Sequence, residues 1–185
     1  MNEKTIIGVI GTISSGKDAV ADYICSQFSL KNYSFSNELR YEAAARGLDN
    51  ARANLFAIAN ELRSNYGSEE LARRTLSRIS EELAIVTSVR YPAELKYLRD
   101  NSNFYLISVD APIELRFEMS RQRGRIGDGE TFEKFKQAED HELRGDNPEL
   151  HFLSCMRAAD YFVINDGTLE ELNKRVDEIM KAVLR

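Results

Sequence analysis

The chain has 185 residues, of which 43% are hydrophobic and 30% charged, and its formal net charge is −5. This length and composition suit one folded domain over residues 1 to 185 and exclude a disordered chain, while the acidic balance argues against a nucleic-acid partner. No apolar run reaches the ~20 residues that span a membrane, and the first residues lack the apolar core of a signal peptide, so we expect a cytoplasmic protein without a membrane partner.

The first elements are predicted to be a strand, a glycine-containing loop and a helix. Residues 5 to 10 (TIIGVI) are almost all apolar and rich in β-branched side chains, which is typical of a buried strand in a parallel sheet. This strand ends at Gly11. Apolar side chains then recur at helical spacing from Ala19 to Phe28, which predicts a helix over residues 17 to 28.

The next part of the chain is predicted to hold a short strand and then mostly helices. Residues 33 to 35 favour a strand, and Ser36 is the expected N-cap of the helix that follows. Apolar spacing predicts two further helices, over residues 51 to 66 and 69 to 83, separated by a Gly-Ser pair. A helical region is therefore expected over residues 37 to 83.

Further apolar runs at 83 to 89 (LAIVTSV), 104 to 109 (FYLISV) and 161 to 164 (YFVI) are strand candidates, and helical stretches separate them. Strands that alternate with helices indicate an α/β fold with a parallel sheet covered on both faces. The segment from 124 to 129 (GRIGDG) is rich in glycine and lies between two helical patterns, so we expect it to be exposed.

Residues 11 to 18 read GTISSGKD, which fits the GxxxxGK part of the Walker A phosphate loop. Gly11 and Gly16 allow backbone conformations that turn amide groups inward, at the positive N-terminal end of the next helix, and Lys17 can reach the outer phosphates. The alternative is an ordinary strand-to-helix turn with a solvated lysine. On the first interpretation the loop binds ATP. The residues expected to bind it are Gly11, Thr12, Ile13, Ser14, Ser15, Gly16, Lys17, Asp18 and Ala19.

Asp18 stands where the Walker A pattern has Ser or Thr, whose hydroxyl contacts magnesium. Its carboxylate is a candidate ligand for Mg²⁺, directly or through water. The alternative, which the sequence leaves open, is that Asp18 only stabilises the start of the helix through its charge.

The order of motifs over nearly the whole chain resembles that of small P-loop kinases, the group that contains nucleoside monophosphate kinases and dephospho-coenzyme A kinases. The segments that carry the resemblance are GTISSGKD, YSFSNELR, NELRSNYG, IVTSVRYPAEL, ISVDAP, RQRGRIGD and INDGTLEEL. The GKD loop is similar to that of phage deoxynucleotide monophosphate kinases and of P-loop domains attached to some deoxycytidylate deaminases. The resemblance implies a single-domain, three-layer fold with a five-stranded parallel sheet in the order 2-3-1-4-5, helices on both faces and an arginine-bearing lid.

The resemblance also implies transfer of the γ-phosphoryl group of ATP, with Mg²⁺, to a small phosphate-bearing acceptor, preferably a nucleoside or deoxynucleoside monophosphate. Arg40 matches the arginine that holds the acceptor's phosphate, next to Ser36 at the start of its helix. Arg63 and Arg90 are further acceptor candidates, and Arg90 is the better one because ligands of such sheets bind beyond the carboxyl ends of the strands. A capped helix with a surface arginine remains the alternative for Arg40.

Four arginines fall within ten residues around the glycine-rich segment, and this cluster resembles the lid of the group, over residues 113 to 141. They are Arg116, Arg121, Arg123 and Arg125. Phosphoryl transfer depends on positive groups around the transferred charge and on exclusion of water, so Arg121, Arg123 and Arg125 are predicted to be catalytic together with Lys17. A charged, solvated helix end is the alternative.

One feature departs from the family. Related kinases often carry an acidic residue at the end of the third strand, whereas this chain has Thr87, Ser88, Val89 and Arg90 there. Asp18 or Asp110 are the candidate replacements. The departure keeps a non-catalytic nucleotide sensor open as a rival function, beside a dephospho-coenzyme A kinase whose acceptor is a hydroxyl. Residues 165 to 167 approach adenine in the resembled kinases, but by themselves indicate only a turn before a helix capped by Thr168.

Overall fold

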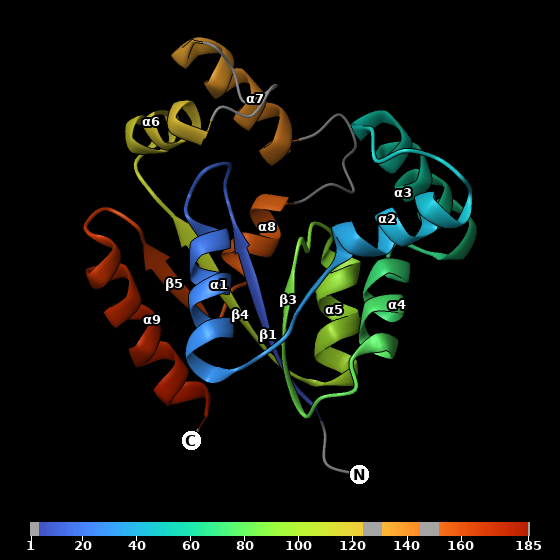
Figure 1. Cartoon of the computed structure of the whole chain (residues 1–185), viewed down its shortest axis with the longest axis horizontal. Coiled ribbons are helices and arrows are strands. Elements are labelled where there is room, and N and C mark those ends of the chain that lie inside the picture. The colour runs from blue at the N-terminus through green and yellow to red at the C-terminus, as the bar shows by residue number, and fades with distance from the viewer. Residues whose placement is uncertain (1–3, 124–130, 145–151, 185) are drawn as a thin grey trace.

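The computed structural model describes residues 4–123, 131–144 and 152–184, which form alternating strands and helices (Figure 1). The strands are β1 (Thr5–Gly11), β2 (Asn32–Ser34), β3 (Leu83–Thr87), β4 (Asn103–Asp110) and β5 (Tyr161–Ile164). The helices are α1 (Lys17–Phe28), α2 (Phe35–Ala45), α3 (Arg52–Tyr66), α4 (Glu70–Arg78), α5 (Pro92–Asn101), α6 (Ile113–Arg123), α7 (Phe132–Arg144), α8 (Phe152–Arg157) and α9 (Leu169–Val183). None of the helices in these ranges is both long enough and apolar enough to cross a membrane.

The strands form one parallel sheet in the spatial order β2-β3-β1-β4-β5, which confirms the expected fold class. β1 lies at its centre, so Thr5 pairs with Leu83 of β3 on one side and with Asn103 of β4 on the other. A central strand is covered by helices on both faces, and for this reason β1 is an almost continuous apolar run in the sequence.

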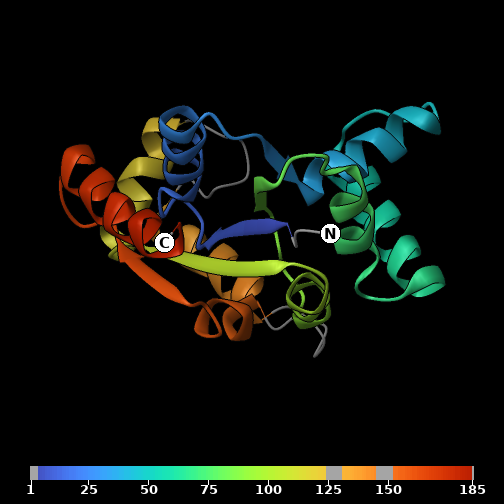
Figure 2. The same cartoon turned by 90° about the horizontal axis from the view of Figure 1, so that it is seen from below.

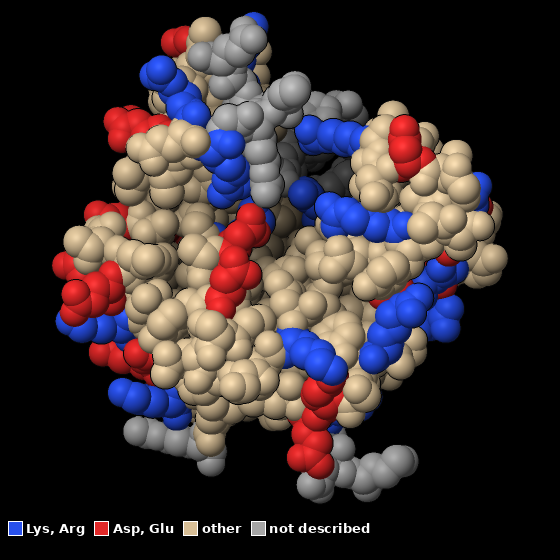
Figure 3. Space-filling model, viewed as in Figure 1, with Lys and Arg blue, Asp and Glu red and all other residues tan. Residues whose placement is uncertain are grey.

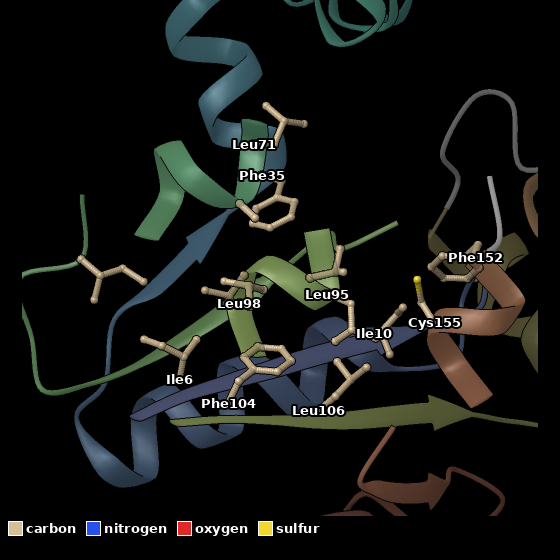
Figure 4. Packing of buried hydrophobic residues seen from close by; sticks show 14 of the residues in the cluster. Ile6, Ile10, Phe35, Leu71, Leu95, Leu98, Phe104, Leu106, Phe152 and Cys155 are labelled. Atoms are coloured by element: carbon tan, nitrogen blue, oxygen red, sulfur yellow. The ribbon is translucent and has the colours of Figure 1, made fainter. Parts of the chain in front are cut away.

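Helices cover both faces of the sheet (Figure 2). Successive side chains of a strand point to opposite faces, so Ile7 and Val9 pack with α1 and α9, whereas Ile6 and Ile10 pack into the core on the other face. The core on that second face includes side chains from α2, α3, α4, α5 and α8 (Figure 4). Representative members are Phe35 of α2, Leu98 of α5, Phe104 of β4 and Phe152 of α8.

The predicted start of α2 needs a correction. Its N-cap is Ser34 rather than Ser36, because the Ser34 hydroxyl accepts the backbone N–H of Ser36 at 3.2 Å. Phe35 already belongs to the helix, so the short strand predicted for residues 33 to 35 ends at Ser34. Ser36 itself lies in the first helical turn.

Two predicted boundaries near β3 are wrong. The helix expected over residues 69 to 83 ends at Arg78, because Ile79 has extended backbone angles (φ −70°, ψ 115°) and Leu83 begins β3. At its other end β3 stops at Thr87, since Ser88 has a φ of 71°, which is uncommon for a residue other than glycine.

The helices beside the sheet fall into two groups at its carboxyl edge. In Figure 1, α2 and α3 lie on one side of this edge and α6 and α7 on the other, and the view in Figure 2 agrees. The carboxyl ends of the strands therefore open between two helical groups.

Candidate active site

The loop between β1 and α1 lies at the carboxyl edge of the sheet, where ligands of open α/β sheets bind. β1 ends in this loop at Gly11, and the neighbouring β4 ends at Asp110. Asn165, the residue after β5, donates its backbone N–H to the Asp110 carbonyl oxygen at 2.7 Å. Three strand ends are thus held together around the loop.

Both glycines of the loop are required by its geometry. A Cβ atom at Gly11 would lie 2.4 Å from the carbonyl oxygen of Val109. Gly16 has a φ of +93°, and a Cβ atom there would lie 2.5 Å from Nδ2 of Asn165. A side chain at either position would displace a neighbouring backbone or amide group, so the sequence pattern has a steric cause.

Side chains from outside the loop hold two of its carbonyl groups. Asn165 Nδ2 donates to the carbonyl oxygen of Ser15 at 3.0 Å, and Arg116 Nη1 donates to that of Ile13 at 3.4 Å. In a trans peptide the C=O and N–H point in opposite directions. The amides of Ser14 and Gly16 therefore point away from these two side chains, in the orientation that an anion-binding loop needs.

A third contact fixes the beginning of the loop. The Thr12 hydroxyl donates to Oδ1 of Asp110 at 2.7 Å, and the backbone N–H of Ala111 donates to the same oxygen at 2.9 Å. Asp110, considered from the sequence as a replacement magnesium ligand, therefore positions the loop through one of its carboxylate oxygens.

Two loop hydroxyls are buried without a partner. Ser14 and Ser15 are 1% and 0% exposed, and neither Oγ atom has a hydrogen-bond partner among the described residues. An unsatisfied buried polar group costs about 1–3 kcal/mol, so such atoms call for a ligand. Hydroxyl donors beside a helix N-terminus suit a phosphate. This observation supports the predicted phosphate loop independently of its sequence pattern.

Lys17 and Asp18 begin α1 directly after the loop. Asp18 is exposed, and its carboxylate lies 4.0 Å from Nη1 of Arg123 in α6. An exposed carboxylate beside the loop is the chemistry that a nucleotide-bound Mg²⁺ accepts, since that ion usually takes one or two carboxylates and completes its shell with phosphate and water oxygens. Within the described ranges, no group of three or more His, Cys, Asp or Glu side chains is arranged to hold a metal ion.

Three serine hydroxyls meet where β2 and β3 end. The Oγ atoms of Ser34 and Ser88 are 3.0 Å apart, and the Ser36 hydroxyl donates to Ser88 Oγ at 3.1 Å. Ser36, predicted to contact the acceptor, thus lies in a polar cluster at the carboxyl edge, in the first turn of α2.

Arg63 of α3 is held by a buried acid. Its Nη2 lies 3.3 Å from Oε1 of Glu94, and its guanidinium lies 4.0 Å from the ring centroid of Tyr91. Glu94 is fully buried and also accepts the backbone N–H groups of Arg90 and Tyr91, at 2.8 and 3.0 Å. Burial raises the pKa of Glu94, and the charge of Arg63 and the two N–H groups oppose that rise.

Glu94 therefore links Arg63 to the turn that carries Arg90. The sequence analysis did not predict this link. The available signal was Pro92 followed by Glu94, at the first and third positions of α5, where an acid commonly bonds back to the amides before the helix. Arg90 lies with its guanidinium 5.6 Å from the ring of Phe152, whereas Arg40 is exposed and donates to Asn37 in its own helix at 2.8 Å.

The arginines of α6 differ in environment. Arg116 is buried, whereas Arg121 and Arg123 are exposed, and Arg121 lies 6.0 Å from the ring of Phe117. Arg125 and the glycine-rich segment from 124 to 129 lie outside the described residues. Figure 3 shows a hollow between the α6–α7 side and the α2–α3 side, with Lys and Arg side chains on both walls. Positive charge gathers locally, although the chain is acidic overall.

The turn after β5 also contributes in a way that the sequence did not predict. Its Asn165 side chain supports the phosphate loop, as described above, and Asp166 pairs with Arg175 of α9 at 2.7 Å. Thr168 caps α9 as predicted, accepting the backbone N–H of Glu171.

The sheet order, the glycine loop and the helical groups on either side define the fold of the P-loop small-molecule kinases. A Thermus thermophilus structure, TT1252, is similar with a TM-score of 0.65 and 21% identity, covering 99% of this chain and 99% of that one. Shikimate kinase from Bacteroides thetaiotaomicron is similar with a TM-score of 0.62 and 13% identity, covering 98% and 99% of the two chains.

The chain belongs to the UPF0200 family. It is 31% identical over 185 residues to a UPF0200 protein of Methanosarcina acetivorans, covering 97% of this chain and 96% of the relative. A UPF0200 protein of Hyperthermus butylicus is 31% identical over 182 residues, covering 96% of this chain and 94% of that protein. No family model matches the chain.

Proposed function

We propose that this protein transfers the γ-phosphoryl group of ATP to a small phosphate-bearing acceptor, with a nucleoside or deoxynucleoside monophosphate preferred. The observation that carries the proposal is the loop over residues 11 to 18, in which Arg116 and Asn165 hold two carbonyls and the buried Ser14 and Ser15 hydroxyls have no partner among the described residues. The kinase fold shared with the shikimate kinase supports the same reaction class.

On the donor side, the amides of the loop and Lys17 bind the ATP phosphates, and Asp18 would hold Mg²⁺ together with phosphate oxygens. The ion would neutralise charge on those oxygens. Arg121 and Arg123 lie on the neighbouring α6, where they can stabilise the transferred group. We retain Arg125 as a candidate from the sequence alone.

On the acceptor side, Ser36, Arg40, Arg63 and Arg90 are the proposed binding residues. Arg63 is the best oriented of them, since Glu94 and the Tyr91 ring fix its guanidinium. Its Nε is buried, and no residue in the described part of the chain forms a hydrogen bond with it. A guanidinium in a fixed position suits a phosphate because its planar donors bind two oxygens at once. The phosphate of a monophosphate acceptor would accept the γ-phosphoryl group, giving a diphosphate and ADP.

An acceptor panel tests the proposal directly. ADP release would be measured with ATP and magnesium over nucleoside and deoxynucleoside monophosphates, dephospho-coenzyme A and shikimate. Acceptor-dependent ADP formation with monophosphates is the expected result. Turnover only with dephospho-coenzyme A or shikimate would instead assign a hydroxyl acceptor. Lys17→Ala should abolish most ATP binding in calorimetry, and unchanged affinity would refute the phosphate loop itself.

A nucleotide sensor is the second candidate, and the end of β3 favours it. Thr87 and Ser88 supply no carboxylate where related kinases order magnesium, and Thr87 instead donates its hydroxyl to Asn32 at 3.1 Å. Tight ATP binding without ADP formation on any acceptor of the panel would decide for the sensor.

A further inference from the structure

Arg116 is the one arginine of the predicted lid cluster that the structure buries, among those that it describes. It is 6% exposed, and its guanidinium contacts oxygen atoms of the loop, of α7 and of the residues just before α6. Its Nε donates to the carbonyl oxygen of Ala111 at 2.7 Å and lies 3.5 Å from Oδ1 of Asp110. Its Nη1 donates to the carbonyl oxygen of Ile13 and to Oε1 of Glu139 in α7.

Glu139 is itself 5% exposed, so the pair is buried on both sides. Burying an arginine costs free energy unless its N–H groups find hydrogen-bond acceptors. A buried ion pair therefore fixes the orientation of its side chains more reliably than it adds to net stability. The guanidinium fork is rigid, so a group that binds one of its nitrogens restrains the partners of the others. Glu139 and the Ile13 carbonyl share Nη1, which makes the position of α7 relevant to the phosphate loop.

We propose that the Arg116–Glu139 pair is a positioning device that couples the α6–α7 helices to the phosphate loop. Glu139 orients the guanidinium, and Arg116 then holds the Ile13 carbonyl so that the Ser14 amide faces the bound phosphate. Arg116 is thus a positioning residue, separate from the exposed arginines of α6. The inference rests on the proposed function, because it assumes that the loop binds phosphate.

The coupling can be tested because it predicts a sign opposite to that of simple electrostatics. Removing a negative charge near an anion site should strengthen anion binding, so charge alone predicts tighter binding for Glu139→Gln. Gln keeps an acceptor oxygen but loses the charge that holds the guanidinium firmly, so loss of orientation predicts weaker binding, roughly 2- to 30-fold for a coupling of about 0.5–2 kcal/mol. The probe is inorganic tripolyphosphate, measured by calorimetry. Glu133→Gln, an exposed acid in the same helix, is the matched control and should bind as the wild type does or slightly more tightly.

A second variant separates orientation from charge at the arginine. Arg116→Lys keeps the positive charge but loses the fork, so it should also bind tripolyphosphate roughly 2- to 30-fold more weakly. In the double variant the two losses should not add, because both remove the same arrangement. Circular dichroism and thermal melting would establish that each variant is folded. If Glu139→Gln does not fold, Glu139→Asp keeps the charge and shortens its reach, and weaker binding is again expected.

The outcomes separate this inference from the proposed function. If wild-type protein does not bind tripolyphosphate, the phosphate loop and the inference both fail. If it does bind, and folded Glu139→Gln binds equally or more tightly, the coupling is overturned while the phosphate loop stands. Additive losses in the double variant would also overturn it. Unchanged affinity of Glu139→Asp would do the same where that variant replaces Glu139→Gln.

Discussion

Glycine is required at position 16 for two reasons, its backbone conformation and its close approach to Asn165. Its φ of +93° is a region that side chains other than glycine disfavour, and the space where a Cβ atom would lie is taken by the Asn165 amide. Gly47, after α2, has a φ of +69°, but no atom of the described residues lies within 4 Å of such a Cβ atom. A side chain at Gly47 would therefore cause backbone strain alone, whereas one at Gly16 would cause the same strain and also a clash with Asn165.

We predict that Gly16→Ala and Gly47→Ala will each lose about 1–2 kcal/mol of unfolding free energy from backbone strain, and that Gly16→Ala will lose more because of the clash. Only Gly16→Ala should also weaken ATP binding, by about tenfold or more, because the displaced Asn165 releases the Ser15 carbonyl. Chemical denaturation and calorimetry measure these quantities. Equal ATP affinity in the two variants would show that Asn165 does not orient the loop.

The cysteines give a second prediction at the scale of single residues. Burial, with a smaller effect of the Glu94 charge, raises the pKa of Cys155 to about 12, and partial burial also raises that of Cys25. At pH 8 the thiolate fraction of Cys155 should be on the order of 1000-fold below that of an exposed cysteine. Iodoacetamide should therefore label Cys155 only after unfolding, as read by mass spectrometry. Rapid labelling of the folded protein would mean that α8 opens readily.

At the scale of elements, a chain of ion pairs joins α2, α3 and α4. Its members are Glu42 of α2 with the C-cap residue Arg46, Glu61 of α3, and Glu70, Arg73 and Arg74 of α4. Arg74 bridges Glu42 and Glu70 with 2.7 Å contacts to each. The exposed pair of Arg46 and Glu61 is expected to contribute little, whereas Glu70 is buried and bonded to two arginines. The network links α4 to α2 and α3, the two helices that carry the proposed acceptor residues Ser36, Arg40 and Arg63.

Glu70 gives this network a pH dependence. Hydrogen bonds from Arg73, and secondarily from Arg74, lower the pKa of Glu70 against the opposing effect of burial. A carboxyl group whose pKa is lower in the folded than in the unfolded state stabilises the protein at pH values above the unfolded pKa, which is about 4.3 for Glu. This stabilisation is lost as the pH falls through the folded pKa.

We therefore predict that Glu70→Gln will be about 1–3 kcal/mol less stable than the wild type at pH 7, and that the gap will narrow between about pH 5 and pH 3. Urea unfolding over that range measures it. Glu178→Gln, at an exposed position of α9, is the control and should differ by less than about 0.5 kcal/mol. A gap that widens in acid would contradict the assigned sign.

The helix and strand boundaries show where local sequence is sufficient. Residues 17 to 28 form α1 as predicted, because apolar spacing and the preceding glycine act locally. The sequence pattern places the end of α4 too late. Ile79 continues the helical spacing of apolar residues and its side chain is buried, but its backbone is already extended. Ser34 and Ser36 are both good caps, and the choice between them depends on where β2 leaves the sheet.

At the scale of the whole molecule, Arg123 of α6 lies beside the start of α1, which follows the phosphate loop. Substituting it tests whether this arginine binds ATP in the ground state or stabilises the transition state. Arg123 is near Asp18 but only at 4.0 Å and partly exposed, so this pair should add little to stability. We predict that Arg123→Met will keep the melting temperature and ATP affinity nearly unchanged while lowering kcat by at least about 10-fold, because its charge acts on the transferred group. Steady-state kinetics with the acceptor found in the panel, together with calorimetry, measure both. A loss of affinity as large as the loss of kcat would make Arg123 a ground-state ligand.

The fold could be predicted because strands alternating with helices define a parallel sheet, and the resemblance to P-loop kinases supplied its order. The place of the loop at residues 11 to 18, between β1 and α1, could also be predicted, because its two glycines and its lysine lie within seven residues of sequence. The sequence could not predict the positioning roles of Arg116, Glu94 and Asn165, because each contacts a partner that is distant in the sequence. The Asn165 side chain, for example, donates to the carbonyl oxygen of Ser15. The roles of the acceptor and catalytic residues stay predictions.

The central place of β1 has a consequence during synthesis. This strand is made first, but Thr5 must wait for Leu83 and then for Asn103 before both of its edges are paired. At about 5–20 residues per second, a ribosome needs on the order of 5 to 20 s to supply the second partner. Over that time at least one edge of the apolar run that includes Ile6, Ile7 and Val9 is unpaired, so we expect the nascent chain to offer chaperones a binding segment that the finished protein no longer exposes.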